Sequence, residues 1–324
     1  MRDNIWKNGI MGLVIGDALG SPVQFLPREK LRKQGLVTGM EAGGAYQTPA
    51  GTWTDDSSMA LATMDSIICN NGINRIDIMS RFESWLYHGM YTPFGKAFDN
   101  GATCTRAIET YTKTHNHLTC GRTDEWANGN GGLMRILPAC LYSIDEVLNV
   151  DSAITTVHAV TALTHNHPRA LIGSGIYYFL ANAIVISNGD PGRDLNSILQ
   201  AGMDDARAFY TGMGMEKYKK DLAKYDRLFR IDDLKQINEN GIRSSGYVVD
   251  TLEAAVWSLA NTSSFCDALL LAVNLGHDAD SVGAVTGGLA GLYYGYDDIP
   301  EDWLGVIQRR EWIEDLCTRI AVLI

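Results

Sequence analysis

The sequence predicts an all-α protein built as a single domain. Apolar residues recur three and four positions apart through most of the 324-residue chain, which is the period of helices buried on one face. Alternating apolar and polar residues, typical of half-buried strands, are scarce, and residues 35–46 are a weak strand candidate. Hydrophobic residues make up 46% of the chain, enough for a large core, and no Pro- or Ser-rich linker divides it.

The predicted helices follow one another along the chain. The first spans Ile10, Leu13, Val14 and Asp17, so it carries a carboxylate on its apolar stripe. Apolar repeats predict further helices after the sequence TDDS (around 59–67) and over about 154–160, 171–186, 248–259 and 281–294. The charged segment at about 204–243 is expected to be a helical excursion on the surface.

Glycines recur at helical distances in residues 283–291. Small residues allow two helices to approach closely, although each glycine costs a helix about 1 kcal/mol relative to alanine. A membrane dimerisation motif is the alternative, but Asp280 and Asp297 bound the segment too tightly for that. The last predicted helix is therefore expected to pack closely on a neighbour.

Charge and cysteine usage exclude several classes of protein. The chain has 27 Lys and Arg against 38 Asp and Glu, a net charge of −11, which disfavours a nucleic-acid binder because such binding depends on cations. The six cysteines have no metal-ligand spacing, which disfavours structural zinc and a disulfide scaffold. The uncharged segment 170–189 contains Ser and Asn and fits a buried helix better than a membrane span. No signal peptide is visible, so we expect a cytoplasmic protein.

Two short acidic segments stand out, Thr54-Asp55-Asp56-Ser57 and Asp278-Ala279-Asp280-Ser281. Each precedes an apolar helix rich in small residues, and helix capping would explain either one alone. Carboxylate and hydroxyl oxygens are also the ligands that Mg²⁺ prefers. If the two segments meet in the fold, four crowded carboxylates would repel one another, and bound cations are the simplest compensation.

Three further segments allow more than one interpretation. The turn Gly129-Asn130-Gly131-Gly132 could present backbone N–H groups to phosphate, or be a plain turn. His165 lies two residues before His167, where a helix-end turn before Pro168 is the simpler explanation and zinc binding the weaker one. Asp99 is most simply a turn residue.

Taken together, six segments resemble the ADP-ribosylglycohydrolase family. They are GLVIGDALG (12–20), GTWTDDSSM, FDNG, NGNGGLMR, THNHPRA and GHDADSVGAVTGGLAG, in the family's order over residues 9–291. The resemblance implies an orthogonal helical bundle with a central cleft that holds two Mg²⁺ or Mn²⁺ ions. The implied metal ligands are Thr54, Asp55, Asp56, Asp278, Asp280 and Ser281, the last replacing a common threonine. The implied substrate-binding residues are Asp99, Asn130, Gly131, Gly132, Met134 and His165, with the NGNGG loop cradling the diphosphate and ribose of ADP-ribose.

The resemblance also implies an activity, the removal of ADP-ribose from a protein side chain, with arginine expected first. The metal ions would orient the ribose and lower the pKa of a bound water, and Asp55 or Asp56 would accept the water's proton. We expect an ADP-ribosylated protein or ADP-ribose itself as partner, and neither nucleic acid nor membrane. A di-metal phosphohydrolase that cleaves the diphosphate is another possible activity.

One departure from the family's pattern falls at Gln24. The family commonly reads V-E-F after GDALG, with the glutamate near the reacting ribose, whereas this chain reads Val23-Gln24-Phe25. A glutamine cannot act as a general base. The chain could be a variant made to trap ligand, a natural variant that relies on Asp55 or Asp56, or a crystallin-like binder without turnover; we expect activity.

Overall fold

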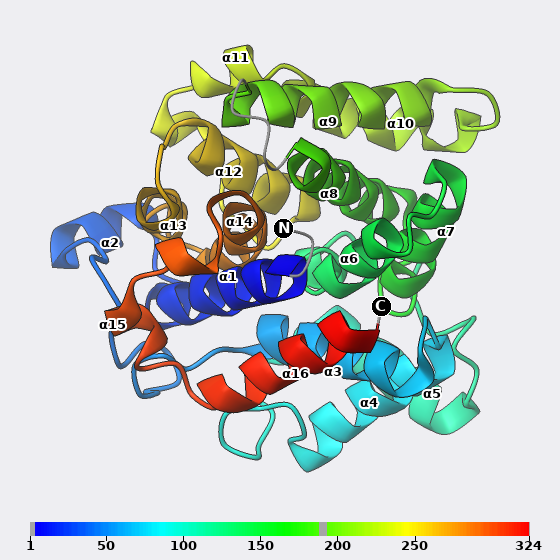
Figure 1. Ribbon diagram of the computed structural model, residues 1–324, viewed down its shortest axis with the longest axis horizontal. Helices are drawn as coiled ribbons and strands as arrows, with labels where there is room; N and C mark the ends of the chain where they lie inside the picture. Colours follow the sequence, from blue (N-terminus) through cyan, green and yellow to red (C-terminus); the bar gives the residue numbers. More distant parts are fainter. Residues whose placement is uncertain (1–3, 188–192, 324) are drawn as a thin grey trace.

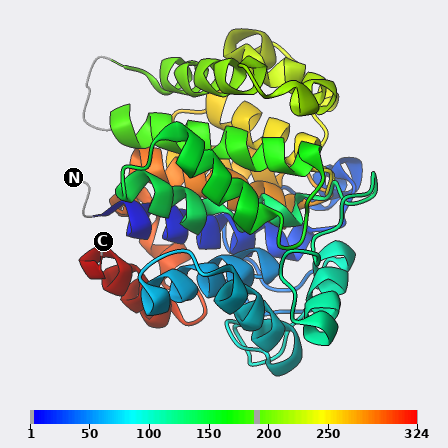
Figure 2. The same cartoon turned by 90° about the vertical axis from the view of Figure 1, so that its right-hand side faces the viewer.

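The computed structural model describes residues 4–187 and 193–323, and 67% of the chain is helical. Sixteen α-helices and no strand are found in the described residues, which confirms the predicted all-α class. The helices stack in layers (Figure 1), with α8 and α9 on one side, α1 and α14 in the middle, and α3, α4 and α16 on the other. The turned view shows the same layers (Figure 2).

The helix bounds are as follows. In chain order they are α1 (Ile5–Gly20), α2 (Arg28–Gln34), α3 (Asp55–Asn70), α4 (Arg75–His88), α5 (Ala102–Thr114), α6 (Leu137–Asp145), α7 (Val150–Thr161), α8 (Pro168–Ser187), α9 (Leu195–Thr211), α10 (Lys219–Leu222), α11 (Ile231–Lys235), α12 (Val248–Ala260), α13 (Phe265–Val273), α14 (Ala279–Tyr294), α15 (Glu301–Leu304) and α16 (Arg310–Leu323). Short 3₁₀ turns include Ser21–Val23 and Asn130–Gly132.

Helices α1 and α14 lie antiparallel at the centre of the molecule and pack backbone against backbone. A Cβ atom added to Gly16 would come within 2.0 Å of the carbonyl oxygen of Gly283, and one added to Gly283 within 2.2 Å of the carbonyl oxygen of Gly16. This close approach needs the small residues that the sequence places there. It brings the C-terminal end of α1, with Asp17, beside the N-terminal end of α14.

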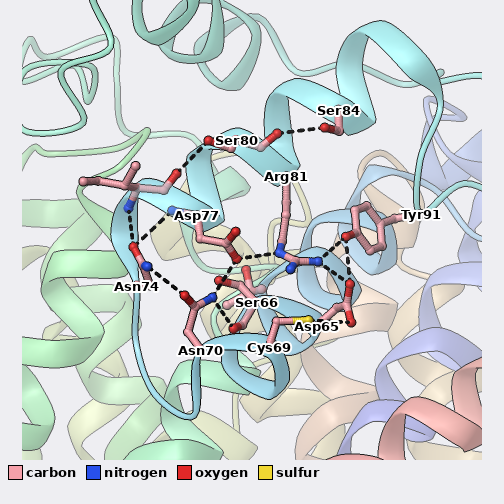
Figure 3. A network of polar contacts seen from close by, with 12 residues as sticks. Asp65, Ser66, Cys69, Asn70, Asn74, Asp77, Ser80, Arg81, Ser84 and Tyr91 are labelled. Atoms are coloured by element: carbon pink, nitrogen blue, oxygen red, sulfur yellow. Dashed lines mark hydrogen bonds and ion pairs between the residues drawn. The ribbon is translucent and has the colours of Figure 1, made fainter.

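Helix α3 is held from both sides. Thr54 caps its N-terminus, and the N–H of Thr54 donates to both carboxylate oxygens of Asp17 at 3.0 Å. Further along, Arg81 of α4 binds Asp65 of α3 and Asp77 of its own helix, and the Tyr91 hydroxyl donates to Asp65 at 2.9 Å (Figure 3). Helix α3 is thereby attached to α1 at its start and to α4 through Asp65 in its second half.

The weak strand candidate at residues 35–46 is wrong. These residues form an irregular loop after α2, with a single bridge between Gly43 and Thr48. Gly43 and Gly44 have φ angles of +119° and +72°, which a regular strand does not accommodate. In the described part of the chain no second strand is present to pair with this segment.

The apolar helix predicted at 171–186 lies within α8. Its length and composition would allow a membrane crossing, as would α1 and α2 if they counted as one bent span, but α8 is mostly buried among other helices. The charged segment 204–243 contains the end of α9 and the short helices α10 and α11. Apolar side chains from it, such as Tyr210, Tyr225 and Leu228, are buried on the α8 and α12 side.

Candidate active site

A cavity of about 250 Å³ opens where three helices, α3, α5 and α14, begin. Its lining comes from segments far apart in the sequence: Gln24, Phe25, Asp55, Asp56, Asp99, Gly101, Ala102, Thr103, Cys104, Gly129, Asn130, Gly131, Met134, His165, Gly246, Asp278, Asp280 and Ser281. Helix N-termini carry partial positive charge and free N–H groups, so the cavity combines carboxylates with groups that attract anions.

All but two of the site residues predicted from the sequence line this cavity. The two exceptions are Thr54 and Gly132. Thr54 is buried behind Asp56, and its hydroxyl donates to Asp56 Oδ2 at 3.2 Å. Gly132 faces away from the cavity lining, toward Thr161 and the backbone side of His165. Both lie directly behind residues that do line the cavity.

The two acidic segments meet at the floor of the cavity. The Ser281 hydroxyl of α14 donates to Asp56 Oδ2 of α3 at 3.4 Å, across 225 positions of sequence. Two carboxylate oxygens, Oδ1 of Asp56 and Oδ1 of Asp280, are fully buried without any hydrogen-bond partner among the described residues. Unpaired buried oxygens of this kind are costly unless a ligand satisfies them.

Burial and mutual repulsion shift the acidity of these groups. The pKa values of Asp55, Asp56 and Asp280 are raised well above 3.8, first by burial and then by neighbouring carboxylates. Burial also raises the pKa of Asp278, against the hydrogen bond from Asn130. Ionisation of these carboxyl groups therefore places poorly solvated negative charge in the cavity.

Without divalent cations, the free energy of unfolding is expected to fall as the pH rises from about 4 toward neutrality. A carboxyl group with a raised pKa binds more protons in the folded state than in the unfolded state, so its contribution to stability is present below 3.8 and is lost through the folded-state pKa. For Asp17 this window runs from 3.8 to about 6. Urea unfolding in chelator at several pH values checks this. In Asp55→Asn the free energy of unfolding should fall less steeply with pH than in the wild type. A free energy of unfolding that rises with pH in both proteins would contradict the raised pKa values of the cavity carboxyl groups.

Asp17 supports the floor of the cavity from behind. Its carboxylate accepts the N–H of Thr54, the N–H of Ser57 at 3.0 Å and the Ser57 hydroxyl at 2.6 Å. Burial raises its pKa to about 6 although these hydrogen bonds lower it. The sequence placed this carboxylate on an apolar stripe but gave it no role, because its partners lie 37 and 40 positions away.

The glycine-rich loop forms one wall. The Asn130 backbone N–H donates to the Gly246 carbonyl at 2.9 Å, and its side-chain amide donates to Thr251 at 2.9 Å and also to Asp278. Gly131 packs against Cys104 and His165. Beside this wall, α5 begins at Ala102 with no side chain capping it, and residues 101–104 line the same cavity. Gly101 belongs to the segment FDNG, but residues 102–104 carry no side chain that indicates binding and could not be predicted from the sequence.

Replacing Gly131 with alanine is expected to weaken ADP-ribose binding about 10- to 100-fold. The added Cβ would come within 2.8 Å of Cys104 Sγ and 2.9 Å of His165 Cε1, so the wall must shift. A shift of about 1 Å in a site that positions its ligand can reduce its function about 100-fold. Titration calorimetry with ADP-ribose measures the loss. Gly39→Ala serves as a control outside the cavity, since its added Cβ would come no closer than 3.5 Å to any neighbouring atom, which is ordinary van der Waals contact. Unchanged affinity in Gly131→Ala would remove this wall from the binding site.

The mouth of the cavity carries an unpaired amide and exposed aromatic rings. Gln24 is only 2% exposed, and neither its amide oxygen nor its nitrogen has a partner. Phe25 is 55% exposed at a φ angle of +66°, a backbone conformation that bulky residues rarely adopt. Tyr46 contacts both Phe25 and Phe98 edge to face, and its hydroxyl donates to Asp99 at 3.0 Å.

The oxygen atoms at the floor of the cavity suit a hard cation, but they do not form a ready-made cage for one. Carboxylate and hydroxyl oxygens of both acidic segments face one another, and two oxygens lack partners. Within residues 4–187 and 193–323, no three His, Cys, Asp or Glu side chains already surround one point as an ion cage. A bound ion would thus depend on small side-chain movements and on hydroxyl ligands as well as carboxylates.

Comparison with known proteins agrees with the pattern of the site. The family model for ADP-ribosylglycohydrolase matches residues 4–324. An ADP-ribosylarginine hydrolase of Serratia proteamaculans is 34% identical over 314 residues, 97% of this chain and 78% of the relative. The ADP-ribosyl-dinitrogen reductase glycohydrolase of Rhodospirillum rubrum is 30% identical over 304 residues, 93% and 89% of the two chains. A solved structure described as an ADP-ribosylglycohydrolase-related protein complex matches with a TM-score of 0.75 at 30% identity, over 99% of this chain and 98% of that chain.

Proposed function

Because the chain belongs to the ADP-ribosylglycohydrolase family and is an ADP-ribosyl hydrolase, we propose that it removes ADP-ribose from a modified arginine side chain with the help of divalent metal ions. The observation that carries this proposal is the meeting of the two acidic segments, with two unpaired buried carboxylate oxygens, at the floor of one cavity.

Asp55, Asp56, Asp278 and Asp280 would hold the ions, together with the hydroxyls of Thr54 and Ser281. Bound Mg²⁺ or Mn²⁺ would neutralise this charge, bind ribose hydroxyls and lower the pKa of a water molecule. Burial and mutual repulsion raise the pKa values of these carboxyl groups, and bound divalent cations would relieve the same repulsion.

Asp55 is the better placed of the two candidate bases. Its carboxylate lines the cavity and makes no side-chain hydrogen bond in the described chain, whereas Asp56 Oδ2 is occupied by the hydroxyls of Thr54 and Ser281. A free carboxylate oxygen that faces the cavity can accept a proton from water as that water attacks the ribose anomeric carbon. We therefore assign proton acceptance to Asp55, whereas Asp56 would act as an ion ligand only.

The remaining walls suit the other parts of ADP-ribose. We place the diphosphate against the start of α5, which no side chain caps, and against the Asn130–Gly132 turn, because helix N-termini and glycine-rich turns bind anions through backbone N–H groups. His165 and Met134 complete this wall. The diphosphate would thus lie over a wall of donors while the ribose reaches the acidic floor.

The mouth of the cavity supports arginine as the acceptor. A guanidinium binds well to aromatic faces and to carboxylates. Phe25 and Tyr46 offer exposed rings beside Asp99, whose Oδ2 has no partner among the described residues. The name of the Serratia relative, an ADP-ribosylarginine hydrolase, supports the same acceptor.

Gln24→Glu is expected to raise the rate of hydrolysis while metal binding is retained. The buried amide of Gln24 lines the cavity without a partner, so a carboxylate there can accept a proton where an amide cannot. An increase of about tenfold or more is consistent with general-base assistance. Single-turnover assays measure the rate and calorimetry measures Mn²⁺ binding. Equal or lower turnover in the glutamate form would exclude a catalytic role for this position.

The proposal is tested by product analysis with ADP-ribosyl-arginine protein as substrate, with Mg²⁺ and with chelator. The expected result is free ADP-ribose and unmodified arginine with Mg²⁺ only. Release of AMP would favour cleavage of the diphosphate instead, and the absence of any product would favour a binder without turnover. ADP-ribosyl-serine protein in a parallel reaction tests the acceptor, and faster release from serine would overturn the assignment of arginine.

A further inference from the structure

We propose that the buried residues Arg135 and Thr164 fix His165 in the tautomer that carries its proton on Nε2, so that this N–H donates to an oxygen of the bound ADP-ribose. Arg135 and Thr164 act through His165 and are positioning residues. The identification of the ligand as ADP-ribose rests on the proposed function, whereas the tautomer of His165 follows from the contacts within the protein alone.

Arg135 is a buried cation without a carboxylate partner in the described chain. Its side chain is completely buried, and its guanidinium lies 4.8 Å from the centre of the Phe82 ring. Nη2 donates to the Thr164 hydroxyl at 2.7 Å and to the Val160 carbonyl at 3.3 Å. Nε and Nη1 have no partner. Burying an unpaired charge lowers the stability of the fold, which suggests that Arg135 has a role next to the glycine-rich wall.

The Thr164 hydroxyl stands between this cation and the imidazole. Its oxygen accepts from Arg135 and lies 2.8 Å from His165 Nδ1. A positive charge on one side turns the O–H bond toward the other side, where Nδ1 can accept it. The Thr164 hydroxyl is also within reach of the Cys104 thiol, but burial raises the pKa of that thiol to about 12, and a neutral sulfur is a weaker acceptor than an imidazole nitrogen.

His165 itself is neutral near physiological pH. It is 2% exposed, and burial together with the nearby Arg135 and Arg122 lowers its pKa to about 3. A neutral imidazole has a single N–H, and an Nδ1 that accepts from Thr164 leaves that proton on Nε2.

Nε2 faces the ligand side of the wall. The imidazole lines the cavity, and Nε2 lies beside Gly129 and Gly131, the two glycines that flank Asn130. Nε2 makes no hydrogen bond with any described residue. It is also absent from the fully buried polar atoms without a partner, as expected for an atom open to the cavity. A donor N–H at this point attracts a phosphate or ribose oxygen, whereas the opposite tautomer would present a lone pair and repel it.

The test is ¹⁵N NMR of the imidazole nitrogens in the full chain, combined with calorimetric titration of ADP-ribose in Mg²⁺. In the wild type we expect the Nε2–H tautomer of His165. Thr164→Val, nearly isosteric, should give a mixture of tautomers and about tenfold weaker ADP-ribose binding, as expected for one lost hydrogen bond to a charged group. Thr164→Ser should restore both readouts.

Thr161→Val is the matched control, because this buried threonine bonds only to its own helix carbonyl, Val157, and the tautomer and affinity should not change. An Nδ1–H tautomer in the wild type, or an unchanged tautomer in Thr164→Val, would overturn the inference. A wild type that shows the Nε2–H tautomer but binds no ADP-ribose would instead refute the proposed ligand, and with it the proposed function.

Discussion

Replacing Asp280 with asparagine is expected to lower metal-dependent hydrolysis about 10²–10³-fold or more and, in the absence of metal, to stabilise the fold. The carboxylate is buried, has one oxygen without a partner, and is repelled by Asp278 and Asp56. Asparagine keeps the shape but removes the charge. Without cations, the substitution removes the burial penalty and the repulsion that raise the pKa of Asp280, so the free energy of unfolding should rise near neutral pH.

Thermal unfolding in chelator and in Mg²⁺ separates these two effects. The wild type should gain stability on addition of Mg²⁺, because an ion that binds only the folded state stabilises it. Asp280→Asn should unfold at a higher temperature than the wild type in chelator and should gain little stability when Mg²⁺ is added. Asp297→Asn, which removes an exposed carboxylate outside the cavity, should follow the wild type. A variant that keeps full activity and the full Mg²⁺ response would exclude Asp280 as a ligand.

Asp17→Ala is expected to lower the free energy of unfolding by about 2–4 kcal/mol and to remove most of the activity. The substitution leaves the N–H groups of Thr54 and Ser57 and the Ser57 hydroxyl without their acceptor, and each unsatisfied buried donor costs about 1–3 kcal/mol, offset in part by loss of a desolvated charge. The start of α3 then loses its attachment to α1.

Urea unfolding and kcat/KM measurements check this prediction. Asp17→Asn keeps one oxygen acceptor in nearly the same place, so its loss of stability should be smaller. If Asp17→Ala were as stable and as active as the wild type, the carboxylate would have no part in positioning the acidic floor.

Much of the fold could be predicted from local pattern. The helical period of apolar residues and the glycines of 283–291 correctly indicated helices and one close helix contact, which the structure shows between α1 and α14. The strand candidate at 35–46 failed because a local alternation says nothing about whether a partner strand exists. Gly43 and Gly44, both at positive φ, instead turn the chain back on itself.

The site was only partly accessible from the sequence. Local chemistry marked both acidic segments, but only the resemblance to a family placed them together, since no pattern reveals that Asp56 and Ser281 touch. The role of Asp17 depends on contacts with residues 37 and 40 positions away. The link from Arg135 to His165 passes through Thr164, which is next to His165 in sequence but 29 positions from Arg135. Such contacts appear only once the helices are packed.

We propose above that two remote acidic segments form one centre for divalent cations. Equilibrium binding of Mn²⁺, followed by calorimetry, tests it most directly in the wild type and in Asp55→Ala and Asp280→Ala. We predict two ions per wild-type chain and weakened binding in both variants, although the substituted residues belong to different helices. Undiminished Mn²⁺ binding in both variants, or no Mn²⁺ binding by the wild type, would contradict the proposed cation centre.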